Sequence, residues 1–460
     1  MSVRIESPDT LLGKLQRGHG AGYLEALKMP SDAVGPLLID CVCHDPRIDR
    51  QVESRCEYYA SLINKMNVDI SPLEKHLKEN DDTEDFGWNA NLTVETLGAL
   101  ALIGNDDAAM ILRNYLSYGY WWDWAVYDLL KTDNIEYTIG IAEVLSQRFG
   151  GYYELYEKLS SIDMDSLDIL CQLNPSLKMF SAKVSLDDSR RKNEDRDNSN
   201  YTELSLDEIF QVCDMGNWRK LSNIIASKVS DSDVAFLNEI MISAERFRAG
   251  LAAVALGKIK TSESFECLKC FLEGYSGKGD KFPYVRALNN IALFPKEICL
   301  ETGRKWFNSC RYPISVAARN ILEKYAEAKD IPMLINAIRT SLKDEVEKCY
   351  ILCSAVDALA NFKNYGMIPE VEMIYQKARY SYARWRAVKT MQENASDEFW
   401  FKYSYECLFD CEDWAVNLAL DSFESVDKSD TVLIERLQEI YEHSEDDKEL
   451  RDKINMLLSK

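Results

Sequence analysis

The stretch Arg248-Ala-Gly-Leu-Ala-Ala-Val-Ala-Leu-Gly-Lys-Ile259 is followed by a polar turn and then by Phe265-Glu-Cys-Leu-Lys-Cys-Phe-Leu272. In both segments apolar residues recur every three to four positions, which is the spacing of one face of an α-helix. The first segment is rich in Ala and Gly and lets a neighbouring helix approach closely, whereas the second carries bulky side chains. Neither helix can bury its apolar face alone, so the pair predicts further helices packed against it.

The same alternation of a small-residue helix and a bulky helix recurs towards the C-terminus. The spacings between the first alanines of successive small-residue helices are 38, 30, 38, 32 and 28 residues, with a mean of about 33, for the positions 249, 287, 317, 355, 387 and 415. A self-similar period of this length predicts a stacked array in which each helical pair covers the apolar face of the next.

A less regular array precedes this one. Residues 94–116 read as one helical pair, and residues 52–66 with 70–77 read as another. Residues 186–200 contain almost no apolar side chains and carry charges of both signs, which is typical of a flexible linker. We therefore expect N-terminal repeats over 1–182, a polar linker or disordered loop over 183–204, and C-terminal repeats over 205–460 that end in an acidic capping pair.

Composition agrees with a helical protein and restricts its partners. The 460 residues include only 20 Gly and 11 Pro, while hydrophobic residues make up 46%. Lys and Arg number 54 against 76 Asp and Glu, which gives a net charge of −22. So acidic a chain disfavours nucleic acid as a partner and favours basic proteins.

Several patterns bear on the compartment and on chemistry. No run of apolar residues approaches the length of a membrane span, and the N-terminus does not resemble a secretory signal. The 13 cysteines are odd in number and scattered, which is typical of reduced thiols in a cytoplasm. Neither the Cys41-Val-Cys-His44 stretch nor the lone Cys267-Leu-Lys-Cys270 completes a zinc site, and no nucleophile motif is present. We expect no metal, no cofactor and no catalytic residues, and we expect Gly18 to Gly22 to form a flexible turn.

Two short motifs resemble the HEAT-repeat family, including its shorter bacterial type. They are Ala255-Leu-Gly-Lys-Ile259 and Ala101-Leu-Ile-Gly-Asn-Asp-Asp-Ala108, each at a helical pair. The stretches 15–24 and 45–55 are similar to segments of bacterial HEAT-like repeat proteins. The resemblance implies an all-α, armadillo-like α-solenoid, wound as a right-handed superhelix in one or two blocks. It implies no activity, because solenoids of this type serve as adaptors, transport factors, lyase subunits and DNA glycosylases.

Arginines accompany several of the small-residue helices. In a stacked array they would align along one surface and could bind carboxylates or phosphates of a partner. They could equally form an internal ladder to carboxylates and carbonyls of neighbouring repeats, and the sequence leaves both interpretations open. The arginines considered as partner-binding residues are Arg248, Arg286, Arg319, Arg384 and Arg386.

The run Tyr120-Trp-Trp-Asp-Trp124 concentrates three of the nine tryptophans. Exposed Trp side chains are favoured interface anchors, so Trp121, Trp122 and Trp124 are further candidates for partner binding, with core packing as the alternative. Tryptophans beside an aspartate also resemble the site of HEAT-like DNA glycosylases.

The function expected from these patterns is a non-catalytic scaffold that holds a protein or peptide partner, and the acidic charge favours a basic one. A HEAT-like glycosylase or lyase and an acidic inhibitor of the immunity type are the alternatives.

Overall fold

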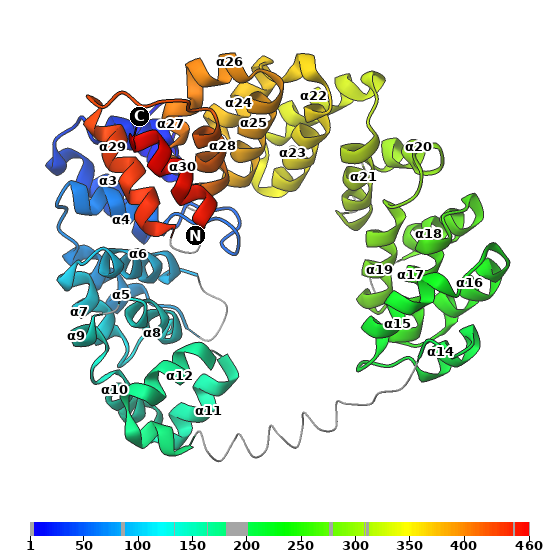
Figure 1. The fold of residues 1–460 in the computed structure, drawn as a ribbon, viewed down its shortest axis with the longest axis horizontal. Helices are drawn as coiled ribbons and strands as arrows, with labels where there is room; N and C mark the ends of the chain where they lie inside the picture. The colour runs from blue at the N-terminus through cyan, green and yellow to red at the C-terminus, as the bar shows by residue number, and fades with distance from the viewer. Residues whose placement is uncertain are drawn as a thin grey trace. The chain divides into compact units, whose positions relative to one another are not determined.

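The computed structural model describes residues 4–83, 88–132, 134–162, 164–180, 201–275, 279–307, 309, 312–444 and 447–459, and every regular element in them is a helix (Figure 1). The all-α expectation is confirmed for this part of the chain. Most of the expected linker, residues 183–200, lies outside the described residues. None of the described helices is long and apolar enough to cross a membrane.

The helical pair that dominates the sequence forms α17 (Arg246–Ile259) and α18 (Ser262–Gly274). Lys260 ends α17 in the left-handed conformation with φ 60°, and Thr261 then caps α18 by accepting a hydrogen bond from the Ser264 N–H. A Cβ on Gly257 would lie 2.5 Å from the Cβ of Asn290 in the next small-residue helix. The small residues of α17 therefore serve the close helix approach that the sequence predicts.

Helix contacts divide the chain into two compact units. Unit 1 comprises Met1–Arg196 together with Gly366–Lys460, and unit 2 comprises Asp197–Tyr365. The C-terminal helices thus pack with the N-terminal ones. The boundary expected near 183–204 separates residues 1–182 from 205–460, whereas in the structure Gly366–Lys460 belong to the same unit as Met1–Arg196.

Unit 2 alternates two kinds of helix. Helices α17, α19, α21 and α23 contact one another in succession, and α16, α18, α20 and α22 pack beside them. The marker alanines at 249, 287, 317 and 355 all lie in the first set. The helices of unit 2 besides α17 and α18 are α14 (Leu206–Val212), α15 (Trp218–Ile224), α16 (Val234–Ser243), α19 (Lys281–Ile291), α20 (Lys296–Phe307), α21 (Tyr312–Tyr325), α22 (Ile331–Ser341) and α23 (Glu345–Ala360).

The N-terminal part of unit 1 contains the two expected pairs as α4 with α5 and α6 with α7. Pro72 stands in the first turn of α5, where a helix tolerates it, and Gly104 with φ 88° separates α6 from α7. These helices are α1 (Leu11–Arg17), α2 (Gly20–Ala26), α3 (Ser31–Cys43), α4 (Cys56–Lys65), α5 (Ser71–Asn80), α6 (Asn91–Leu102), α7 (Asp106–Tyr115), α8 (Trp122–Leu130), α9 (Ile135–Thr138), α10 (Ile141–Phe149), α11 (Tyr152–Ile162) and α12 (Met164–Leu173).

The C-terminal part of unit 1 packs against these N-terminal helices. Helix α25 packs against α24 and α28, and α27 contacts α2 near the N-terminus. The helices are α24 (Pro369–Lys377), α25 (Ser381–Asn394), α26 (Ser396–Phe399), η5 (Trp400–Ser404), α27 (Tyr405–Cys407), α28 (Asp413–Asp421), α29 (Thr431–His443) and α30 (Lys448–Ser459). The last two are the amphipathic pair expected at the end of the chain.

Candidate functional site

The densest polar cluster of the described residues lies where the N-terminal and C-terminal parts of unit 1 meet. We call it the junction and define it by residues 16–20 and 45–55 on one side and 377–384 and 406–412 on the other. The two N-terminal stretches fall within or beside the segments that resemble HEAT-like repeat proteins. Arg384 is the one candidate partner-binding residue among the residues of this cluster.

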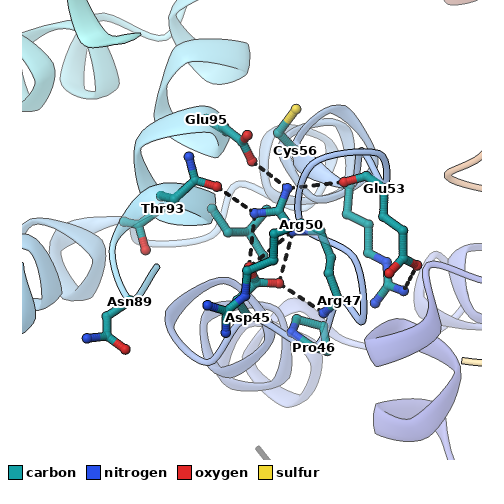
Figure 2. Close-up of polar contacts among 12 residues, drawn as sticks. Asp45, Pro46, Arg47, Arg50, Glu53, Cys56, Asn89, Thr93 and Glu95 are labelled. Atoms are coloured by element: carbon teal, nitrogen blue, oxygen red, sulfur yellow. Dashed lines mark hydrogen bonds and ion pairs between the residues drawn. The ribbon is translucent and has the colours of Figure 1, made fainter. Parts of the chain in front are cut away.

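Arg47 is the centre of the first part of the junction (Figure 2). Its guanidinium lies 2.9 Å from an Asp45 oxygen and 2.8 Å from a Glu95 oxygen, and it also donates to the Asn91 side chain and the Glu53 carbonyl. Burial acts to lower the pKa of Arg47, but the two carboxylates outweigh it and raise the pKa. This charged network fixes the loop between α3 and α4 onto α6.

A second ion pair ties that loop to the C-terminal helices. Arg55 and Glu53 are both fully buried and lie 2.8 Å apart. Arg55 also donates to the carbonyls of Gln16 and Arg379, and Glu53 accepts the N–H of Ser381 at 2.9 Å. The ion pair therefore satisfies backbone groups that are more than 320 residues apart in the chain.

The third part of the junction is the turn between α1 and α2. The Gly18 carbonyl accepts the N–H of Cys411 at 2.9 Å, and a Cβ on Gly18 or Gly20 would collide with Cys411 or with the Glu406 carbonyl. Nearby, Arg384 and Asp410 form a fully buried ion pair at 2.9 Å. The expected turn after Arg17 is present but shorter than predicted, because α2 starts at Gly20 and only Gly18 and His19 separate the two helices, packed against the C-terminal helices.

Burial is the main cause of the shifted pKa values in the junction. Burial lowers the pKa of His19 to about 4 and raises that of the Cys411 thiol to about 12. Burial also raises the pKa of Glu406 and Glu412 to about 7. At neutral pH the imidazole is uncharged and the thiol protonated, so neither is prepared for nucleophilic attack. These protonation states favour a structural role for the junction.

Beside the junction a groove of about 490 Å³ opens between the N-terminal helices α4 and α6 and the C-terminal helices α28 to α30. Its two basic residues are engaged, because Lys65 lies 2.7 Å from Glu439 and Arg436 donates to the Leu408 carbonyl. Three acidic residues of the lining are exposed, namely Glu57, Asp413 and Glu442. The groove is therefore a negatively charged site made from both parts of unit 1.

The two candidate arginines of unit 1 stand two positions apart on α25 and have different environments. Arg384 belongs to the junction and is inaccessible to a partner. Arg386 is half-buried, donates to the Tyr382 carbonyl and stacks 4.5 Å from the Trp385 ring centre. Arg384 thus binds an internal carboxylate, which is the arrangement that the internal-ladder interpretation describes.

The three candidate arginines of unit 2 lie on α17, α19 and α21, the first three small-residue helices of this unit. Arg319 is 4% exposed and its guanidinium lies 5.9 Å from the Tyr350 ring centre, so it is a packed residue. Arg248 is half-buried and donates to the Gln211 carbonyl at 2.9 Å. Arg286 is half-buried and stacks on Trp218 and Phe282. Arg248 and Arg286 keep an accessible side.

The tryptophan run divides between core and surface. Trp122 is buried and packs against Phe149. The indole N–H of Trp121 donates to Asp82 at 2.6 Å, and the exposed Trp124 packs against Trp121. Only Trp121 and Trp124 of the three candidates are available at the surface, and they stand next to carboxylates.

Metal-binding patterns are absent from the described residues. No three His, Cys, Asp or Glu side chains in that part of the chain are grouped so that they could hold an ion. Burial raises the pKa of Cys41 and Cys43 to about 12, which opposes the thiolate form that a metal needs.

Comparison of the chain with family models, with curated proteins and with solved structures gives no match.

Proposed function

We propose that this protein is a non-catalytic binding scaffold, an α-solenoid of HEAT-like repeats wound as a right-handed superhelix, that holds a basic segment of a protein partner. The repeat architecture is supported by the successive contacts of α17, α19, α21 and α23 and by their regular marker alanines. Stacked repeats of this kind present extended surfaces for docking. The observation that carries the choice of partner is the acidic groove of unit 1.

The distribution of charge supports a basic partner. Unit 2 contains 22 basic and 22 acidic residues, which leaves 32 basic and 54 acidic residues for unit 1. The entire net charge of −22 thus belongs to the unit that carries the groove. Such a field attracts cationic segments and speeds their encounter at low salt.

The groove itself offers both charge and apolar contact. Leu102 and Ile103 at its wall are 43% and 37% exposed, beside the exposed carboxylates of Glu57 and Glu442. Within the described part of the chain, neither carboxylate makes a hydrogen bond or an ion pair. A lysine or arginine side chain can therefore place its methylene groups on the wall and its charge at the acidic rim.

The test is the binding of a short fluorescent lysine-rich peptide to the full-length protein, measured by anisotropy at low salt. We expect the E57K/E442K double variant to weaken binding about tenfold, because two charges change sign at the rim and shift its net charge by four units. The glutamate-rich peptide of equal length is expected not to compete. The matched control is E393K/E398K, which changes the same charge at exposed positions of α25 and α26 outside the groove.

Equal losses in both double variants would mean that the peptide follows the overall charge and not the groove, which would contradict the proposal. The same conclusion follows if the lysine-rich peptide does not bind at all.

The glycosylase alternative gains no support from the tryptophan run. Trp121 is engaged by Asp82, and Asp81 accepts hydrogen bonds from Tyr115 and the Tyr120 N–H. These carboxylates would repel the phosphates of a nucleic acid, whereas a glycosylase needs a basic groove there. An acidic inhibitor remains a special case of the proposed scaffold, distinguished only by its partner.

A further inference from the structure

Unit 2 carries a compact cluster of arginines and aromatic rings on α15, α17 and α19. The rings of Trp218, Phe282 and Phe247 pack edge to face, with centres 4.9 and 5.1 Å apart. The Arg286 guanidinium lies 5.2 Å from the Trp218 centre and 5.1 Å from the Phe282 centre. Arg219 lies over Trp218 at 5.7 Å.

Two further guanidinium groups border these rings. Arg246 lies 5.4 Å from the Phe247 centre and 5.6 Å from the Phe282 centre. Arg248, two positions along α17, donates to the Gln211 carbonyl. We call the seven residues the arginine–aromatic face: Trp218, Arg219, Arg246, Phe247, Arg248, Phe282 and Arg286.

The backbone of α17 is adapted to this face. A Cβ on Gly250 would lie 2.4 Å from the Phe282 ring and 3.5 Å from the Arg286 side chain. The glycine thus lets the ring sit against α17 and hold the guanidinium above it. Stacked in this way, the arginines lose little further side-chain entropy when they bind an anion.

The face lacks the carboxylates that arginines of unit 2 have elsewhere. Arg304 is surrounded by Glu301, Glu327 and Asp330, all in contact with its guanidinium. Within the described residues, Arg219 and Arg286 have no carboxylate within 4 Å, and Arg246 has only the loose and exposed contact with Asp280 at 3.7 Å. The Nε of Arg286 is enclosed without a hydrogen-bond partner.

We propose that the arginine–aromatic face binds a carboxylate-rich segment of a protein partner, with Arg219, Arg246 and Arg286 as the anion-binding residues. Planar guanidinium groups match carboxylates with two parallel hydrogen bonds. Unit 2 has no net charge, so its local excess of arginine is not cancelled by a general acidic surplus. The site is distinct from the acidic groove of unit 1 and takes the opposite charge.

A protein segment fits this face better than single-stranded nucleic acid does. Binding of nucleic acid without sequence preference uses open aromatic faces on which bases stack. The guanidinium groups of Arg219 and Arg286 already lie over Trp218, and those of Arg246 and Arg286 lie over Phe282. The face therefore presents N–H donors rather than ring surfaces.

The experiment measures anisotropy of a fluorescent glutamate-rich peptide with the full-length protein, alongside an oligonucleotide of equal charge. We expect the peptide to bind the wild-type protein, and the R219Q/R286Q substitutions to weaken this binding at least about tenfold. The affinity of R286K for the peptide is expected to lie between those of the wild type and of R219Q/R286Q, because an ammonium keeps the charge but loses the two parallel hydrogen bonds. The matched control K305Q/K343Q removes the same charge at exposed positions of unit 2 and is expected to change affinity less than about twofold.

The folding of each variant is checked by circular dichroism. Tighter binding of the oligonucleotide with the same loss in R219Q/R286Q would overturn the proposal in favour of a nucleic acid. Absence of peptide binding, or equal losses in the two double variants, would overturn it altogether. None of these outcomes depends on whether the groove binds a basic segment.

Discussion

Replacement of Arg384 with methionine is expected to destabilise unit 1 by about 3–5 kcal/mol, because Asp410 would remain buried without its counter-charge. Urea unfolding followed by tryptophan fluorescence measures the loss, since seven of the nine tryptophans belong to unit 1. The double variant R384M/D410L is expected to recover much of the stability, because an apolar pair replaces both charges.

The matched control is Arg386→Met on the same helix. Its guanidinium is half-buried and within reach of water, so loss of its contacts, which include the Tyr382 carbonyl and the Trp385 ring, is expected to cost about 1 kcal/mol. Similar losses for R384M and R386M would show that the buried ion pair has no special weight. Failure of D410L to restore R384M would argue against the pairing of these two residues.

The second large effect is expected at Gly20, where an added methyl group meets backbone. A Cβ there would lie 1.7 Å from the carbonyl oxygen of Glu406, so α2 and α27 must separate. We expect Gly20→Ala to cost about 3 kcal/mol, at the upper end of what overpacking usually costs. The loss is measured as the shift of the same unfolding transition.

Gly274→Ala provides the control. Gly274 also lies in a helix, but among the described residues nothing stands within 4 Å of the added Cβ. Alanine is the better helix former there, so stability is expected to remain or to rise by up to about 1 kcal/mol. A G20A protein as stable as the wild type would mean that the turn after α1 does not pack against α27.

Local structure was predictable from the sequence wherever side-chain spacing and capping decide it. The helical pairs at 248–272, 94–116 and 433–458 follow from apolar periodicity, and the described residues confirm them as helices. The marker alanines fall in helices throughout. Periodicity reports only which face of a helix is apolar, and this information is enough for fold class.

The pairing of the chain ends in unit 1 could not be predicted in this way. It depends on contacts such as Arg55 with the Arg379 carbonyl and Gly18 with Cys411, whose partners lie more than 300 residues apart. The signal was present in the two glycines at 18 and 20 and in the alternating charges of 45–55. Glycine, however, fits a mobile turn and a crowded contact equally well, and a charged loop fits solvent as well as a buried network.

The candidate binding residues were predictable only in part. The sequence identifies Arg248 and Arg286 but not Trp218, Phe247 or Phe282, which stack around them. It also selects Arg384, which the structure buries with Asp410. Residue type alone does not distinguish an arginine held by an internal carboxylate from one held by aromatic rings, because that depends on the neighbouring helix.

The pairing of the chain ends also matters for the proposed binding, since the acidic groove has walls from both parts of unit 1. Glu57 and Leu102 come from the N-terminal part, and Asp413 and Glu442 from the C-terminal part. Variants that loosen the junction are therefore expected to weaken the binding of the lysine-rich peptide, although the residues at the rim of the groove are unchanged.

The pairing is tested most directly by zero-length carbodiimide coupling of the dilute, monomeric protein, followed by mass spectrometry. Lys65 and Glu439 lie 2.7 Å apart, and their coupling would join a peptide of α4 to a peptide of α29. Lys14 and Glu25, 2.6 Å apart within the N-terminal helices, serve as the internal standard. We predict that both pairs are coupled; coupling of Lys14 to Glu25 without any coupling of Lys65 to α29 would contradict the account.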